Sequence, residues 1–175
     1  FLSTTDISRS PSPFIGNGRI GVVIPPLGIG SSPSFLAGLY EHAPRDVPRI
    51  VSIPTWTAAS VFDGHRWLNP ERPGDNSVDA YTQVLDMRSG VVRTSFHWVN
   101  GSRRMSVGVQ TFVSRADPEL GVIRLDVAPQ YTGRIGVRYH HVPVAADVAE
   151  LLEVRFGRVV NTDVLALDGV AVQTG

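Results

Sequence analysis

Carboxylates are the side chains with the most chemistry to offer, because paired acids serve in general acid–base catalysis. Most of them stand beside or close to glycine or proline, as in Asp63-Gly64 and Asp117-Pro118. Acids at such positions are typical of turns and of caps that bind the neighbouring backbone. No two acids stand out as a catalytic pair, so turn and surface roles are predicted for Asp63, Glu71, Asp75, Asp79, Asp86, Asp117, Glu119, Glu150 and Glu153.

The histidines show no metal-binding spacing. His140 and His141 are adjacent, so on a strand they point to opposite faces and cannot share one metal. His42, His65 and His97 lie on separate segments, and no Gly-x-Ser-x-Gly segment provides a serine nucleophile. The sequence therefore predicts no catalytic residue and no metal ligand.

A glycine-rich segment, Gly16-Asn-Gly-Arg-Ile-Gly21, matches the letters of the dinucleotide fingerprint. That fingerprint requires a helix to open within it, whereas Val22-Val-Ile-Pro-Pro26 continues as a strand and then breaks. The glycines are expected to form a tight turn or bulge. Nucleotide binding is not expected.

The elements that must position these residues are strands. Residues 81–126 read as a β-meander in which Val92, Thr94, Phe96 and Trp98 face one way and the residues between them the other. Asn100-Gly101 predicts a hairpin turn, because both central residues of a type I′ turn need positive φ. Asp63-Gly64 and Asp168-Gly169 predict two more hairpin turns. Loops are expected at 47–54 and 69–77, and one short helix at 144–154.

Composition predicts one folded domain and excludes several functions. The chain has 175 residues, 42% hydrophobic, enough to bury a core. Its sixteen basic residues, all Arg, balance sixteen acids, so nucleic acid and anionic membranes are not expected partners. No apolar run approaches a membrane span. There is no Cys, and the chain begins at Phe1, so the compartment, cytoplasmic or secreted, stays open.

Four segments carry a resemblance. The first three segments are, in chain order, Phe14–Gly21 (FIGNGRIG), Ser34–Tyr40 (SFLAGLY) and Ile53–Trp56 (IPTW). The fourth begins at Leu85 with LDMRSGVVRTSFHW and continues through a hairpin to a strand that ends in FVSRADPELGVIRLDV. Together they resemble the N-terminal domain of glycoside hydrolase family 65, which includes maltose, trehalose and kojibiose phosphorylases and some α-glucoside hydrolases. The resemblance covers roughly residues 14–142.

The resemblance implies an antiparallel β-sandwich of the super-sandwich, galactose-mutarotase-like type. We expect a lead-in over residues 1–13 and the sandwich over 14–175. Catalysis would belong to an (α/α) barrel in a further domain or a second chain. No cofactor is expected, and inorganic phosphate would be a co-substrate if the parent enzyme is a phosphorylase. Such sandwiches usually exceed this length, so three interpretations of the chain remain open: an excised piece, a short protein, or one part of a split enzyme. Each would leave sheet edges uncovered, and uncovered edges predict a homodimer.

Tryptophans are the candidates for binding carbohydrate, because aromatic faces stack on pyranose rings. Trp98 alternates with Phe96 and is expected in the core. Trp56 lies in the segment IPTWT, and Trp67 precedes Asn69-Pro70. Each is predicted either to line a groove or to seal a contact. In the resembled family, loops of the sandwich shape the entrance of the barrel, a role expected here for 47–56.

Three functions follow from these residues. The first is a non-catalytic N-terminal sandwich that supports the barrel of an α-glucoside-active enzyme and shapes its substrate entrance. The second is a stand-alone carbohydrate-binding module that uses Trp56 and Trp67. The third is a mutarotase-like enzyme, which needs a His and a Glu facing each other; His97 with Glu119 is the pair to test.

Overall fold

The computed structural model describes residues 1–41, 47–139, 149–159 and 164–173. Nearly all regular structure is extended, with two short 3-10 helices, η1 (Ile7–Arg9) and η2 (Pro73–Asp75). The strands are β1 (Leu2–Thr4), β2 (Phe14–Gly16), β3 (Ile20–Val23), β4 (Ser34–Glu41), β5 (Arg49–Ile53), β6 (Ala59–Phe62), β7 (Ser77–Asp86), β8 (Val91–Asn100), β9 (Arg103–Val113), β10 (Gly121–Pro129), β11 (Gly136–Tyr139), β12 (Ala149–Val159) and β13 (Val164–Gln173).

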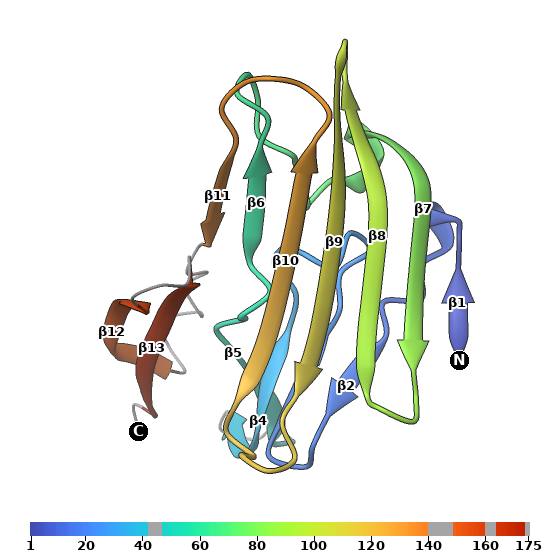
Figure 1. The fold of residues 1–175 in the computed structure, drawn as a ribbon. Helices are drawn as coiled ribbons and strands as arrows, with labels where there is room; N and C mark the ends of the chain where they lie inside the picture. Colours follow the sequence, from blue (N-terminus) through green and yellow to red (C-terminus); the bar gives the residue numbers. More distant parts are fainter. Residues whose placement is uncertain (42–46, 140–148, 160–163, 174–175) are drawn as a thin grey trace.

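These strands form an antiparallel β-sandwich, as the sequence predicted. A five-stranded sheet, β1-β7-β8-β9-β10, lies in front in Figure 1. Behind it lie the four-stranded sheet β2-β3-β4-β5 and the pair β6-β11. Strands β12 and β13 pair with each other. No helix in the described part of the chain is long and apolar enough to cross a membrane.

Alternation along β8 and β9 builds the core. Phe96 and Trp98 of β8 are buried, as are Met105, Val107 and Val109 of β9, while the residues between them face outward. Their core contacts come from the opposite layer and from β7: Leu27, Ile29, Ala59, Val61, Leu68 and Tyr81. Trp98 is 1% exposed, which confirms its predicted core position. Burying one face of each strand fixes the register of the whole sheet.

The β8–β9 hairpin forms where the sequence predicted it, with the turn displaced by one residue. Asn100 pairs with Arg103, so the two central residues are Gly101 and Ser102. Only Gly101 has positive φ, at 61°. Glycine at the first central position is the requirement of a type II′ turn, the other tight turn that matches strand twist.

Two predictions about the last part of the chain were wrong. The helix expected at 144–154 begins in residues outside the described part, and residues 149–154 belong to β12 instead. From Leu152 to Phe156 apolar and charged residues alternate, and this period of two favours a strand. Asp168 and Gly169 lie within β13, opposite Arg155 and Val154, rather than in a turn.

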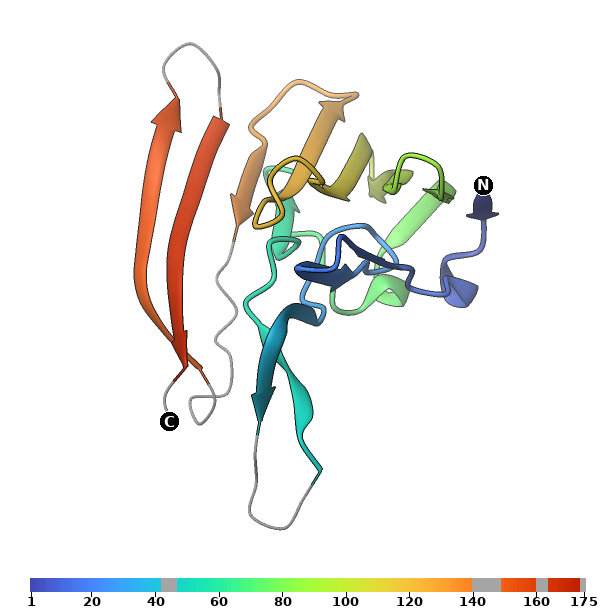
Figure 2. The same ribbon diagram turned by 90° about the horizontal axis from the view of Figure 1, so that it is seen from below.

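The prediction of a loop at 47–54 was also wrong, because Arg49–Ile53 form β5. Strands β4 and β5 make a ribbon that projects from the sandwich (Figure 2). At the other edge, residues 2–4 of the predicted lead-in pair with β7 as β1. Ser10 Oγ also donates to Gln83 Oε1 at 2.9 Å. The boundary between residues 13 and 14 stays a prediction.

The glycine-rich segment is a tight β2–β3 turn, as expected. Gly18 has φ of 90°, and Asn17 Oδ1 accepts hydrogen bonds from the backbone N–H of Arg19 and Ile20. Gly16 and Gly21 are opposite one another. A Cβ on Gly21 would lie 2.4 Å from the ring of Phe14, so the glycine makes room for an aromatic lying flat on the sheet.

Candidate functional site

Asp63 is the most deeply buried carboxylate in the described residues. It is 1% exposed, and its Oδ1 accepts the backbone N–H of His65 (2.7 Å) and Arg66 (2.8 Å). Its Oδ2 accepts Asn100 Nδ2 at 2.6 Å. Burial raises the pKa of Asp63, but these hydrogen bonds outweigh it and hold the pKa below its usual value. An acid kept ionised in this way is a turn residue, as the sequence predicted, and a poor proton donor.

The backbone of Asp63 joins three segments. Its carbonyl accepts hydrogen bonds from Arg103 and from the Tyr131 hydroxyl, both at 2.9 Å. The Arg103 guanidinium also lies over the Tyr131 ring, 4.6 Å from its centroid. The Asp63-Gly64 turn is thereby fastened to the β8–β9 hairpin and to the loop that follows β10. Polar contacts therefore hold these three segments together at this end of the sandwich.

Trp67 lies on the same end and is the more accessible of the two candidate tryptophans. It is 36% exposed, and its ring centroid is 5.1 Å from that of Phe62. The guanidinium of Arg138, on β11, lies 4.1 Å from the centroid of the indole. A ligand that stacks on that face of the indole has to displace Arg138.

Trp56 is more enclosed. Its indole packs against the small core cluster around Ile15 and Val22 and against Gly121, where a Cβ would come within 2.5 Å of the ring. The Nε1 hydrogen is buried and has no acceptor among the described residues. Such a tryptophan closes the edge of the sandwich between the 54–58 segment and β10.

The two tryptophans do not share a groove. Trp56 contacts Gly121, the first residue of β10, whereas Trp67 lies beside Gly136, which follows the other end of that strand. Nine residues of extended chain separate these ends, which is roughly 25–30 Å. Only one of them can therefore line any single entrance.

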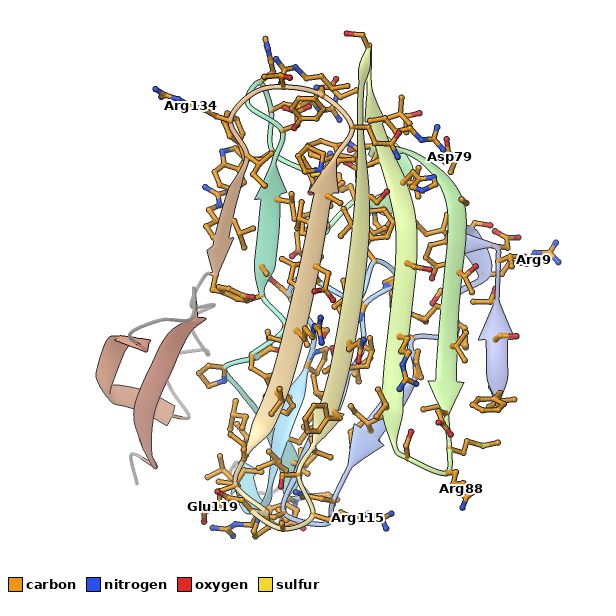
Figure 3. The ribbon with its side chains drawn as sticks, viewed as in Figure 1. Arg9, Asp79, Arg88, Arg115, Glu119 and Arg134 are labelled. Carbon is orange, nitrogen blue, oxygen red and sulfur yellow. The ribbon has the colours of Figure 1, made fainter. Side chains whose placement is uncertain are left out.

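His97 has partners other than the predicted Glu119. Its Nδ1 lies 3.0 Å from Asp79 Oδ1 and 2.6 Å from an Arg104 nitrogen, and Arg104 binds both Asp79 oxygens at 2.7 and 2.8 Å. Glu119 instead forms a 3.6 Å ion pair with Arg19. Asp79 and Glu119 lie at opposite ends of the five-stranded sheet (Figure 3). The pair required for mutarotase chemistry is not formed.

Several other acids in the described residues also bind protein groups. Asp86 and Asp117 accept backbone N–H groups two or three residues ahead, and Asp126 pairs with Arg124. Glu71 accepts the backbone N–H of Ser31 at 2.7 Å. No group of three or more His, Cys, Asp or Glu in this part of the chain is placed to hold a metal ion. His42, His140 and His141 lie outside the described residues.

Comparison with known proteins places this geometry in a family. The model of the glycosyl hydrolase family 65 N-terminal domain matches residues 12–171. The chain belongs to this family. The match extends beyond the range of the sequence resemblance, through β12 and into β13.

Relatives of this family 65 domain include two yeast enzymes. Over 170 residues the chain is 26% identical to a periplasmic/secreted acid trehalase of Candida glabrata, covering 73% of the chain and 14% of that protein. Over 81 residues it is 32% identical to a periplasmic acid trehalase of Saccharomyces cerevisiae, covering 45% of the chain and 6% of that protein. The chain therefore spans a small part of either relative.

A solved structure shares the fold. It is described as a kojibiose phosphorylase from the human microbiome and aligns with a TM-score of 0.63 at 14% sequence identity. The alignment covers 85% of this chain and 22% of that one. The family 65 domain thus has the architecture of a segment within a much longer enzyme of known structure.

Sequence reasoning missed the cluster of Asp79, His97 and Arg104. The alternation of β8 and β9 placed His97 and Arg104 on the outer face, but the cross-strand register was needed to bring them together. Asp79 is further displaced by a bulge in β7 between Asp79 and Thr82. Asn17 was also missed: its Nδ2 donates to the carbonyls of Ser114 and Pro118 and ties the β2–β3 turn to the β9–β10 turn.

Proposed function

We propose that this family 65 domain is non-catalytic, supports the catalytic barrel of an enzyme acting on α-glucosides, and shapes the entrance to its substrate site. The observation that carries the proposal is the occupation of its acids. Glycoside cleavage needs a carboxyl group free to donate a proton and, in hydrolysis, a second carboxylate. In the described residues, Asp63 and Asp79 spend both oxygens on protein partners. When the chain is incubated with maltose, trehalose and kojibiose, with and without phosphate, every anomeric signal in the proton NMR spectrum is expected to stay unchanged.

The entrance role is assigned to one end of the sandwich. The segment that follows β5 holds Trp56 against β10, so this end is rigid enough to position a neighbouring domain. Loss of the indole in Trp56→Ala would loosen the contact with Gly121. In a complex with the barrel, such a variant should raise KM more than it lowers kcat. Equal effects of Trp56→Ala and Trp67→Ala would contradict the assignment, because the two lie at opposite ends.

A stand-alone carbohydrate-binding module is the second candidate, and the exposure of Trp67 favours it. A sugar that displaces Arg138 from the indole would stack on Trp67 and meet the guanidinium as a hydrogen-bond donor beside it. Titration of the chain with trehalose is expected to quench tryptophan fluorescence if this function holds. The quenching should disappear in Trp67→Ala and persist in Trp56→Ala.

The partner surface proposed for the barrel lies at β11, which pairs only with β6 among the described strands. Ile135, Val137 and Tyr139 alternate along this segment and are 41%, 42% and 38% exposed. An apolar strand edge of this kind favours coverage by another part of the protein. A homodimer is the alternative occupant. Light scattering that gives a monomer at high concentration would contradict the homodimer, and a dimer dissolved by Val137→Glu would establish it.

A further inference from the structure

Strand β2 has one uncovered edge. Among the described strands it pairs with β3 alone, at the end of the four-stranded sheet. The backbone N–H of Asn17 donates to the carbonyl of Ile20 at 3.1 Å, so residue 17 turns its backbone groups toward β3. These groups alternate along an antiparallel pair, so Ile15 also faces β3, whereas the N–H and C=O groups of Phe14 and Gly16 point away from it. They form an edge that can pair with another extended chain.

A groove of about 240 Å³ lies beside this edge. Residues 14–16 of β2 form one wall, and the β7–β8 turn with the ends of β7 and β9 forms the other. Leu85 packs against the small core cluster that includes Ile15 and Val92, whereas Met87 also lines the groove and is 60% exposed. Pockets for drug-sized ligands usually measure roughly 300–1,000 Å³. The smaller groove therefore suits one or two apolar side chains of a larger partner.

Arg115 gives one end of the groove a positive charge. Of the nine residues that line the groove it alone is charged, and its guanidinium has no hydrogen bond or ion pair within the described residues. Asn17 Nδ2 donates to the carbonyl of Ser114 at 2.6 Å, which places Arg115 near the Gly16 end of β2. A partner that supplies a carboxylate at this end, beside apolar side chains, complements the groove.

The acids of the neighbouring turns do not line the groove. Asp86 accepts a backbone N–H of the β7–β8 turn at 3.0 Å, and Glu119 pairs with Arg19 at 3.6 Å. Asp117 accepts the backbone N–H of Glu119 at 3.3 Å. A second copy of the chain that paired through β2 would bring no acid either, because residues 10–18 contain none. The matching carboxylate is therefore expected from a different polypeptide.

We propose that the free edge of β2 binds an extended segment of another polypeptide, added antiparallel as a further strand of the four-stranded sheet. Every pair in this sheet is antiparallel. Residues of the segment opposite Phe14 and Gly16 exchange backbone hydrogen bonds with them, and the residue opposite Ile15 turns an apolar side chain into the groove. Because an antiparallel segment begins at the Gly16 end, its acidic side chain precedes the apolar ones and meets Arg115. The inference does not depend on the proposed function.

Amide chemical-shift mapping tests the site with the peptide acetyl-Thr-Glu-Thr-Leu-Thr-Leu-amide, titrated into the 175-residue chain. The N–H signals of Phe14 and Gly16 should move downfield and exchange more slowly with solvent, because both groups gain an acceptor. Methylating the backbone nitrogens of the two threonines that flank the first leucine removes the N–H groups facing β2 and should weaken binding about tenfold or more. Methylating both leucine nitrogens instead removes N–H groups that face away, and this matched peptide should lose less than about twofold.

A variant of the chain tests the charge. Arg115→Ala should raise the dissociation constant of the glutamate peptide about twofold to fivefold, the effect of an exposed ion pair. It should leave that of a peptide with glutamine in place of glutamate unchanged. Arg134 lies at the opposite end of the sandwich (Figure 3), so Arg134→Ala is the matched control and should bind both peptides as the parent does. Spectral dispersion identical to the parent shows that each variant is folded.

Several outcomes would overturn the inference. The first two are undiminished binding of the threonine-methylated peptide and an equal loss of both peptides in Arg115→Ala. Octanoate offers an apolar chain and a carboxylate without a peptide backbone, so shifts at Phe14 and Gly16 with octanoate alone would make the groove a small-molecule site. The same shifts on concentrating the chain without peptide would indicate a second copy. No shift at all also overturns the inference and leaves the non-catalytic role in place, because turnover tests that role.

Discussion

Replacing Asp63, a buried acid that binds a turn, by alanine should be among the most damaging single changes at the acids. The change removes the acceptor of Asn100 Nδ2 and of two backbone N–H groups. A buried donor left without an acceptor costs about 1–3 kcal/mol. The backbone N–H groups of His65 and Arg66 are partly buried, so water can replace only part of the hydrogen bonding that they lose. We expect the free energy of unfolding to fall by about 2–4 kcal/mol, most of it from the Asn100 amide.

Two variants isolate the cause. Asp63→Asn keeps one carbonyl oxygen to accept the turn N–H groups, and its NH2 can donate to the oxygen of a flipped Asn100 amide, so its loss should be about 1 kcal/mol. Asp86→Ala removes a similar turn acceptor that is open to water, and its effect should be much smaller. Urea unfolding followed by tryptophan fluorescence measures all three. A loss below about 1 kcal/mol for Asp63→Ala would refute the reasoning.

Other predictions concern packing, pH and backbone strain. Gly121→Val forces a side chain into the Trp56 indole and should cost about 1–3 kcal/mol by thermal unfolding, whereas Gly74→Ala, with nothing within 4 Å, should cost little. Because the pKa of Asp63 is lowered by folding, its stabilisation is present above the unfolded-state pKa and lost as pH falls through the folded-state value. The stability difference between the parent and Asp63→Asn should therefore shrink in acid, and a constant difference would contradict this. Ala80 has φ of 50°, so Ala80→Gly should stabilise by about 0.5 kcal/mol, and any destabilisation in urea would argue against strain there.

Strands with one buried face could be predicted from the sequence, because burial and alternation agree there. In β8 and β9 buried residues alternate with outward-facing ones, and most of the buried ones are apolar, so the pattern predicted both strands and the hairpin between them. The segment 144–154 failed because helical spacing of a few apolar residues competes with a period-two pattern that continues to Phe156. In β5 the proline residues at both ends favoured a loop, although four of the five residues between them, all but Val51, pair with β4.

The candidate site was less accessible to sequence reasoning, because it depends on register and on long-range packing. Neither the 54–58 segment nor the turn at Asp63 shows in its own sequence which end of the sandwich it occupies. The separation of Trp56 from Trp67 follows only from their contacts with Gly121 and Gly136. The cluster of Asp79, His97 and Arg104 likewise appears only when three strands are aligned.

Turnover is the most direct test of the claim that this family 65 domain is non-catalytic. A proton NMR time course would follow the chain with maltose, trehalose and kojibiose, each with and without inorganic phosphate. Asp63→Asn, which keeps the turn but removes the best-held carboxylate, serves as the matched sample. The account predicts no change in any anomeric signal for either protein. Release of glucose or a glucose phosphate by the parent chain, lost in the variant, would contradict it.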